Sequence, residues 1–447
     1  MLEIFVQPKF LPEKKYILDI LFKELLQLPY QLNYHKDSSY KIVTESGNYL
    51  EVQDAFFSKF DEAEGYLHEA NIPLSITFGE NSFLSEDNTI ILFGNDEYTK
   101  TDHTINLGND IFAASFYMLT RWEEHVITER DEYDRFPDVK AIAQRFDFHK
   151  RPIVDEYLFM LEKMLRFLGV ETVKNTGGYR LTLTHYIDDM ERYASLYKTF
   201  RALTGDLVRR KSVSLFLKTL LDIFLVKMRR KKDPYDQFDF LLNLAEANEV
   251  NAYFYFIPGI KGERDVRYDF FDPKVGERIS EIIDRGHEVG IHGSLRSNES
   301  LQYYLEERNR FQQIHSLVQH NRQHFLKFSV PDTWQILEKA GMSSDTTLGF
   351  ANDWGFRAGT CLSYPVFDVV QRKCLKIREY PLIVMDTAIK RKYGSLQNMH
   401  RELEKAFKIV KRYNGNLVIL WHNNNINHYD WNGTKKFLEK IVKEIHQ

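Results

Sequence analysis

The sequence predicts an α/β protein, in which a parallel β-sheet closed into a barrel follows a smaller mixed α/β N-terminal domain. From Tyr179 onward, short apolar strands alternate with helices, and strict alternation of this kind is typical of a parallel sheet. About seven strands in about 270 residues favours closure of that sheet into a barrel. The length of 447 residues is enough for two domains at about 100–200 residues each.

The strands expected in the barrel are apolar segments bounded by turns or helices. They are RLTLTHYI (180–187), NAYFYFI (251–257), EVGIHG (288–293), HFLKFSV (324–330), the stretch around GFRAGT (355–360), KIREYPLIV (376–384) and NLVILWH (416–422). The helices expected between them are 236–248, 274–284, 298–319, 332–340 and 396–413.

Two domains are expected, residues 1–175 and residues 179–447, joined by the linker KNTGG at 174–178. The N-terminal half contains no cluster of residues that indicates catalysis. Its expected elements are strands at 3–7 and 89–94, a buried helix at 110–126 and an amphipathic helix at 154–170.

The charge and cysteine content exclude several classes of protein. The chain has 60 lysines and arginines against 64 aspartates and glutamates, a net charge of −4, so no overall basic field attracts nucleic acid. The two cysteines, Cys361 and Cys374, form no CxxC pair, and this favours a reducing, cytoplasmic compartment. Charges and prolines in the first 16 residues disfavour a signal peptide.

Polar residues stand at the ends of several expected strands, where a parallel α/β sheet places its ligands. Asp188 and His292 are the first two candidate metal ligands, because one carboxylate with imidazoles and open positions suits metal-assisted hydrolysis. His422 follows a continuous apolar run and is either a general acid or a strand cap that makes a backbone hydrogen bond. The other polar residues at such ends are His185, His324, Arg357 and Asp386.

An ordered series of motifs carries a resemblance to a known family. The motifs are THYID (184–188), GIHGS (290–294), RQHFLKF (322–328), PDTWQILEKAG (331–341), GFRAGT (355–360) and WHN (421–423). Through them, residues 179–447 resemble the polysaccharide deacetylases, the NodB-homology or carbohydrate esterase family 4 group. The segments ILFGNDE, DIFAASFYMLTRWEEHV, RDEYDRF and RPIVDEY resemble the extra domain that precedes the barrel in one bacterial branch of that family.

The resemblance implies a distorted (β/α)7 barrel that removes an N- or O-acetyl group from a sugar. It also implies a divalent metal cofactor, with zinc the preferred assignment. In the family's first motif, the first aspartate is the general base that activates water and the second aspartate is a metal ligand. The second of these falls on Asp188 and the first falls on Tyr186.

Tyr186 conflicts with the role of a base, because an ordinary phenol has a pKa of about 10. Proton transfer by a positioned group is typically worth about 10²–10⁴ in rate, so its loss is costly. Asp189 is adjacent, but a shift of one residue on an extended segment turns the side chain to the other face. Asp189 is therefore expected to replace the base only through a local bulge.

The remaining site residues follow from the other motifs. The family places a second histidine four residues after the first, where this chain has Arg296, so His324 is expected to be the third metal ligand. Arg357 is expected to orient the base or the acyl oxygen and Asp386 to pair with His422, although each is equally compatible with a structural salt bridge. Substrate contacts are assigned to Ser294, Trp421 and Asn423.

A basic, apolar insertion of about residues 207–233 separates the first two strands of the barrel. Basic residues at 209–211 and 227–232 bound the apolar run 215–226. A basic amphipathic helix can lie on an anionic membrane surface. The plainer interpretation, which is preferred, is a helical insertion packed over the barrel or against the N-terminal domain with its basic ends in solvent.

The leading hypothesis is a cytoplasmic deacetylase that acts on an acetylated sugar or polysaccharide precursor in surface polysaccharide biosynthesis. Peripheral contact with the inner membrane through residues 207–232 is a secondary hypothesis beside it. The competing hypothesis, supported by Tyr186, is a catalytically inactive relative that serves as a sugar-binding or scaffolding module. A third is a hydrolase of different specificity, in which Tyr186 donates a hydrogen bond to a tetrahedral intermediate.

Overall fold

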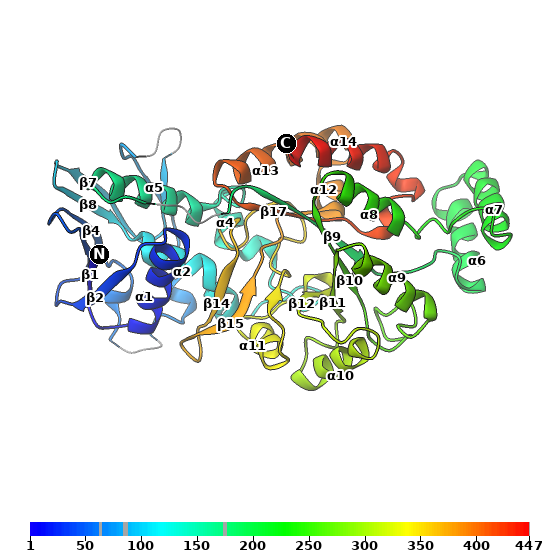
Figure 1. Ribbon diagram of the computed structural model, residues 1–447, viewed down its shortest axis with the longest axis horizontal. Helices are drawn as coiled ribbons and strands as arrows, with labels where there is room; N and C mark the ends of the chain where they lie inside the picture. The colour runs from blue at the N-terminus through cyan, green and yellow to red at the C-terminus, as the bar shows by residue number, and fades with distance from the viewer. Residues whose placement is uncertain (62–64, 84–87, 173–176, 447) are drawn as a thin grey trace.

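The computed structural model describes residues 1–61, 65–83, 88–172 and 177–446, and it confirms the mixed α/β class. Figure 1 shows an elongated molecule with a six-stranded sheet at one end and a larger sheet in the middle. Helices α6 (Leu196–Thr204) and α7 (Val213–Lys227) project at the other end. The linker predicted at 174–178 lies outside the described residues as far as residue 176.

The N-terminal sheet has the order β2-β1-β3-β4-β8-β7 and mixes parallel with antiparallel neighbours. Its strands are β1 (Leu2–Val6), β2 (Tyr30–Tyr34), β3 (Ser39–Val43), β4 (Tyr49–Gln53), β7 (Gly94–Lys100) and β8 (Thr104–Asn109), and β5 (Thr77–Gly79) pairs separately with β6 (Thr89–Ile91). The α-helices described in this half are α1 (Leu11–Leu18), α2 (Ile111–Thr120), α3 (Trp122–Val126), α4 (Ile142–Arg145) and α5 (Ile153–Phe167).

The single helix predicted at 110–126 is wrong in one respect, because it breaks into α2 and α3 at Arg121. Arg121 adopts a left-handed conformation with φ of 52°. Its buried guanidinium pairs with Glu123 and Glu124 just beyond the break. A buried guanidinium needs charged partners, and the break brings Glu123 and Glu124 to Arg121. Apolar periodicity does not report such a requirement, so it predicted one continuous helix.

The larger sheet has the order β14-β15-β13-β12-β11-β10-β9-β17-β16 and is parallel except for the β14–β15 pair. Its strands are β9 (Arg180–Ile187), β10 (Asn251–Phe256), β11 (Glu288–Gly293), β12 (His320–Gln323), β13 (Ser344–Asp345), β14 (Tyr364–Asp368), β15 (Lys373–Glu379), β16 (Val384–Met385) and β17 (Asn416–Leu420). The helices around it are α8 (Phe238–Ala247), α9 (Pro273–Asp284), α10 (Leu301–Gln312), α11 (Asp332–Lys339), α12 (Asp386–Tyr393), α13 (Leu396–Arg412) and α14 (Thr434–His446).

The predicted closure into a barrel is not found in the described part of the chain. The strand order ends at β14 and β16, and no ladder joins these two among the described strands. The sheet is nevertheless curved. Arg322 on β12 donates a hydrogen bond of 2.6 Å to Thr184 on β9, although β11 and β10 lie between these two strands in the sheet order. It also donates one of 2.6 Å to Thr346 beyond β13. The edge strand β16 has only two residues, and the other edge strand, β14, runs antiparallel to its neighbour β15, so the two edges offer few backbone groups for closure.

Two of the predicted strands are wrong, and a third, 376–384, is divided between β15 and β16, which lie toward opposite edges of the sheet. At 324–330, Phe325 and Leu326 have φ values of 58° and 56°, and the Phe325 ring stacks on Tyr133 of the N-terminal half at 4.7 Å. The strand found here is instead β12, which ends at Gln323 and has the polar sequence HNRQ. Residues 355–360 form turns that are held by Asp155, whose carboxylate accepts hydrogen bonds from Thr360 and Cys361.

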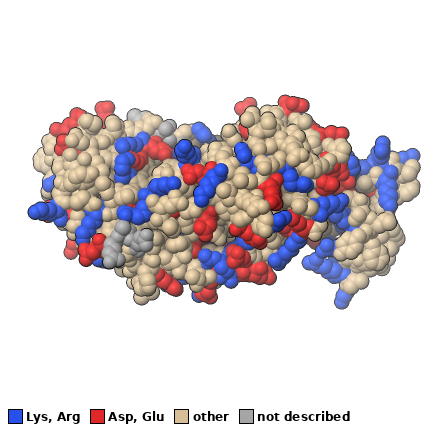
Figure 2. All heavy atoms as spheres, turned by 90° about the horizontal axis from the view of Figure 1, so that it is seen from below, with Lys and Arg blue, Asp and Glu red and all other residues tan. Residues whose placement is uncertain are grey.

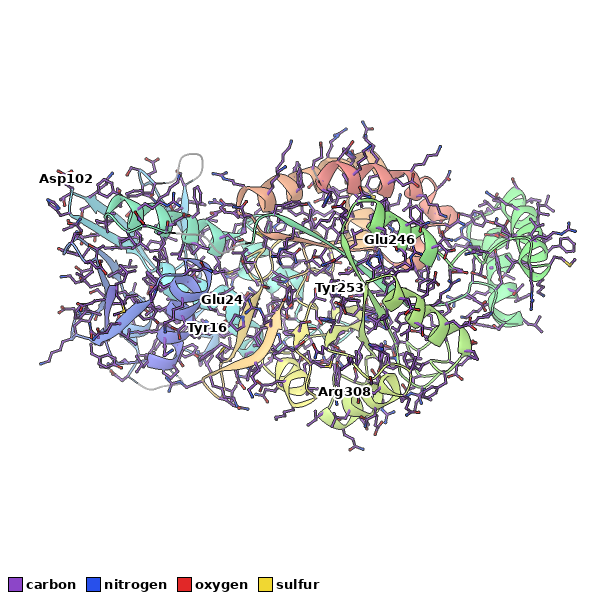
Figure 3. The ribbon with its side chains drawn as sticks, in the orientation of Figure 1. Tyr16, Glu24, Asp102, Glu246, Tyr253 and Arg308 are labelled. Atoms are coloured by element: carbon purple, nitrogen blue, oxygen red, sulfur yellow. The ribbon has the colours of Figure 1, made fainter. Side chains whose placement is uncertain are left out.

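The two halves of the chain share one hydrophobic core. Figure 3 shows Tyr16 and Glu24 beside the β14–β15 hairpin. The Tyr16 hydroxyl donates a hydrogen bond of 2.8 Å to the carbonyl oxygen of Pro365, and Glu24 pairs with Arg378 at 2.5 Å. In the parts of the chain that the structure covers, no helix has both the length and the apolar character needed to cross a membrane.

Candidate metal centre

The candidate metal centre lies at the carboxyl ends of three strands of the larger sheet. Asp188 follows β9, His292 stands near the end of β11, and His324 follows β12. Side chains alternate along a strand, so Thr184, Tyr186 and Asp188 point to the concave interior. His185 points outward instead, where its ring contacts Phe254 at 4.9 Å.

The three predicted ligands come together. The Asp188 Oδ1 atom lies 3.5 Å from His292 Nε2 and 3.7 Å from His324 Nε2. One ligand atom from each of the three buried residues can be chosen so that all lie within 4.8 Å of one another. The sequence therefore identified a real cluster, although the three residues are 136 positions apart from first to last.

Each histidine of the cluster is oriented through its other ring nitrogen. His292 Nδ1 donates a hydrogen bond of 2.8 Å to the carbonyl oxygen of Arg322, and His324 Nδ1 pairs with Asp265 Oδ2 at 2.9 Å. Both Nε2 atoms therefore face Asp188. Metal-binding histidines characteristically have such an outer partner, which fixes the ring and its tautomer.

The residues fit a divalent metal. Asp188 Oδ1 and His292 Nε2 are buried and have no hydrogen-bond partner within the described residues. Leaving a buried polar atom unpaired typically costs about 1–3 kcal/mol, and a bound cation would provide the missing partner. One carboxylate and two imidazoles leave open positions, as expected at a catalytic rather than a structural site.

His422 lies at the edge of the cluster and is held by Asp386. Its Nδ1 donates a hydrogen bond of 2.7 Å to Asp386 Oδ1, and its backbone N–H donates one of 3.0 Å to Oδ2. His422 Nε2 faces the cluster, 3.9 Å from Asp188 Oδ2. A histidine held this way by a carboxylate is suited to proton transfer.

The pKa values within the cluster depend on burial and on the neighbouring charges. Burial lowers the pKa of His292 to about 4, which keeps its imidazole neutral. Burial opposes the charge of Asp188, but His324 and His292 hold its pKa well below the usual range. Burial also opposes a charge on His324, yet Asp188 and Asp265 raise its pKa to about 9. The charges around Asp188 thus favour positive charge beside its carboxylate.

Tyr186 stands where the resemblance implies a base, and its buried phenol is not suited to that role. The side chain is 2% exposed, and no described residue makes a hydrogen bond with its hydroxyl group. Its ring lies 3.9 Å from the His292 ring and 4.9 Å from the His422 ring. Burial raises its pKa far above the ordinary value, so the phenol keeps its proton.

Asp189 does not replace the base. The pairing of β9 with β10 is regular from Thr182 to Ile187, so the strand lacks the local bulge that a replacement would need. The Asp189 carboxylate pairs instead with Lys198 at 2.6 Å. Within the described chain, Asp188 is the carboxylate that faces the Nε2 atoms of both cluster histidines, whereas Asp265 contacts His324 at Nδ1.

Arg357 joins the two halves of the chain and does not orient the cluster. Its guanidinium makes a bidentate pair with Glu124 of α3, with distances of 2.9 and 2.6 Å, and donates to the carbonyl oxygen of Gly349 at 2.9 Å. Both charged side chains are almost completely buried. The salt-bridge alternative for Arg357 therefore matches the structure.

We expect Arg357→Met to lower the free energy of unfolding by about 3–5 kcal/mol, because it leaves the buried Glu124 without one of its cations. Urea unfolding measures this loss. Lys9→Met is the control, since the Lys9–Asp61 pair is exposed and such pairs are worth at most about 1 kcal/mol. A stable Arg357→Met protein that loses only activity would instead favour the orienting role.

The three residues assigned to substrate contacts lie elsewhere. The Ser294 hydroxyl donates to Glu307 of α10, and the Trp421 ring packs on Trp431 and Phe437. The Asn423 amide donates to the carbonyl oxygens of Asp189 and Tyr235. All three side chains are buried, and they support the loops around the cluster.

Asp265 is a site residue that the sequence reasoning missed. It orients His324 and also accepts a 2.8 Å hydrogen bond from the backbone of Leu295, so it connects two loops of the site. The available signal was its place in the loop after β10. The charged residues around it in the sequence give this segment the pattern of a solvent-exposed loop; they are Glu263, Arg264, Arg267 and Asp269.

Comparison with known proteins gives one family model for the N-terminal part and several similar solved structures. Residues 2–169 match a family model described as a family of unknown function, DUF7033. No curated protein matches the sequence. A Mycobacterium smegmatis structure assigned to the polysaccharide deacetylases is similar, with 12% identity and a TM-score of 0.38, over 60% of this chain and 85% of that one.

A second similar structure is a carbohydrate esterase family 4 pseudoenzyme from Bacillus anthracis. It has 10% identity and a TM-score of 0.29, over 61% of this chain and 62% of that one. The fold and the site together define an α/β protein with a buried histidine–aspartate cluster suited to a divalent metal.

Proposed function

We propose that this chain binds a divalent metal at Asp188, His292 and His324 and removes acetyl groups from an acetylated sugar or polysaccharide precursor. The observation that carries the metal site is the unpaired Asp188 Oδ1 atom between two oriented imidazoles. The substrate class rests on the ordered motifs that resemble polysaccharide deacetylases. Cytoplasmic surface polysaccharide biosynthesis is the setting that this resemblance suggests.

A divalent metal held at this site would supply Lewis acidity and make a coordinated water more acidic. The chain itself contributes His422, whose Nε2 faces the cluster and whose Nδ1 is anchored to Asp386. Burial opposes the charged form of His422, but Asp386 raises its pKa above the ordinary value. The Asp386 carboxylate thus favours the protonated form of His422, from which Nε2 could donate a proton to the leaving group.

The second candidate function is sugar binding without turnover. It is favoured by Tyr186, because the buried phenol leaves the cluster without a base on the inner face of β9. The two candidates share the metal site and differ in whether His422 alone supports a measurable rate.

Metal content and acetate release separate the two candidates. We expect the native protein to bind one metal ion and to release acetate slowly from acetylated saccharides. His422→Gln should keep the metal and abolish the release. A metal-loaded native protein that releases no acetate would favour the sugar-binding candidate, and absence of metal from every preparation would overturn the proposal.

A further inference from the structure

The α6–α7 hairpin, residues 196–232, concentrates exposed apolar side chains. Eleven of the 21 large hydrophobic residues that are exposed in the described chain lie in it. Such concentration on a single projecting element is unusual, because exposed apolar residues are normally scattered singly. The eleven are Leu196, Tyr197, Phe200, Leu207, Val208, Val213, Leu217, Leu220, Leu221, Phe224 and Met228.

Helix α7 leaves an apolar stripe exposed to solvent, although part of its apolar surface is turned toward the protein. Exposed apolar residues recur on α7 at positions i, i+4, i+7, i+8 and i+11 from Val213 to Phe224, which is one face of a helix. The buried residues of α7 are Thr219, Asp222 and Ile223. The inward side thus mixes polar and apolar residues, whereas the stripe from Val213 to Phe224 stays uncovered. The rest of the described chain does not bury this stripe, as it would if the whole apolar surface of α7 packed over the barrel.

The charged groups exposed on the hairpin are basic. Its sequence contains eleven lysines and arginines and two aspartates, and both aspartates are buried. Asp206 accepts a hydrogen bond from Thr219 and pairs with Arg210, whereas Asp222 pairs with Lys231. Figure 2 shows lysines and arginines bordering the uncharged surface at this end of the molecule.

The neck of the hairpin is fixed next to the metal cluster. The Asp233 carboxylate accepts hydrogen bonds of 2.7 and 3.1 Å from the backbone N–H groups of Arg192 and Tyr193, which ties the outgoing chain to the returning chain. Lys198 of α6 pairs with Asp189, the neighbour of Asp188. The hairpin therefore projects from the sheet end that carries the cluster, far from the N-terminal sheet (Figure 1).

We propose that the α6–α7 hairpin docks this chain on an anionic membrane surface. An apolar stripe bordered by lysines and arginines matches the boundary between acyl chains and phosphate groups. Helix α7 has 15 residues, about 22 Å at 1.5 Å per residue, which is shorter than the roughly 30 Å of a hydrocarbon core. The helix therefore lies in the membrane plane.

Docking of the hairpin brings the end of the sheet with Asp188 toward the bilayer. The consequence for the substrate, which rests on the proposed function, is that the acetylated sugar is carried on a membrane lipid. Docking itself does not depend on catalysis, so vesicle binding and acetate release fail or succeed independently.

Co-sedimentation of the full chain with vesicles tests the proposal. We expect binding to vesicles of equimolar phosphatidylglycerol and phosphatidylcholine that weakens with added salt, and little binding to phosphatidylcholine alone. Leu217→Ser with Phe224→Ser should weaken the binding at least about tenfold, because each removes an apolar group from the membrane. The double variant Lys227→Gln with Arg230→Gln should weaken vesicle binding about fivefold for each positive charge removed.

The matched control is Leu74→Ser with Leu317→Ser, since these side chains are 84% and 73% exposed on other elements. Unchanged thermal melting of the variants shows that they fold, as expected for exposed positions. Native protein that fails to bind the anionic vesicles, or an apolar variant that binds as tightly as native, overturns the proposal. Loss of a dimer in the apolar variant without vesicle binding would identify a second copy of the chain as the occupant.

Discussion

Tyr186→Asp is expected to raise acetate release by about 10²–10⁴-fold over the native protein, the usual contribution of a positioned acid or base. The substitution places a carboxylate on the inner face of β9, two residues before Asp188 and beside His292, whose ring lies 3.9 Å from the present phenol ring. Steady-state acetate release by the metal-loaded variant measures the effect.

Two other substitutions at Tyr186 separate its possible roles. Tyr186→Asn has the size of the aspartate without its basicity, so it should leave the rate at the native level. Tyr186→Phe removes only a hydroxyl that has no hydrogen-bond partner in the described chain, and it should also leave the rate unchanged. Loss of acetate release in the phenylalanine variant would favour the third hypothesis, a hydrogen bond from Tyr186 to the reacting group.

The gain in rate should be accompanied by a loss of stability. Replacing a buried aromatic ring with a much smaller side chain costs about 3–5 kcal/mol. Arg322 lies 5.4 Å from the centre of the Tyr186 ring, so its positive charge should offset part of the cost for the aspartate. If Tyr186→Asp stays folded and metal-loaded but releases acetate no faster than Tyr186→Asn, lack of a base is not what limits turnover.

Periodicity was sufficient to predict the parallel order of the larger sheet and the position of its first, second and last strands. Strands 180–187, 251–256 and 416–420 are runs of apolar side chains that pack on the core, so local pattern and tertiary structure agree there. The same agreement placed Asp188 and His292 at one edge of the sheet, since carboxyl ends of parallel strands meet.

Local pattern failed where contacts from the other half of the chain decide the backbone. HFLKFSV has the composition of a strand, but Phe325 stacks on Tyr133 and its backbone is left-handed. Arg357 resembled a site residue because GFRAGT is a family motif, yet its partner Glu124 lies 233 positions earlier. No pattern within a short window reports a partner at that distance.

Asp188→Asn is expected to abolish metal binding. Asp188 is the one carboxylate of the cluster, and its Oδ1 atom faces both His292 Nε2 and His324 Nε2. A metal that binds only the folded protein adds about 2.7 kcal/mol to the free energy of unfolding when its concentration is 100 times Kd. That increase should appear in the native protein and disappear in Asp188→Asn.

Asp189→Asn is the matched control, because it makes the same chemical change one residue later, on a side chain that pairs with Lys198. It should keep the full metal-dependent increase. Equal stabilisation of Asp188→Asn and native protein would place the ion outside this cluster, and the deacetylase proposal would fail with it. Loss of the increase in Asp188→Asn alone would instead show that the β9 edge holds the metal, and the Tyr186→Asp experiment would then decide whether this site lacks only a base.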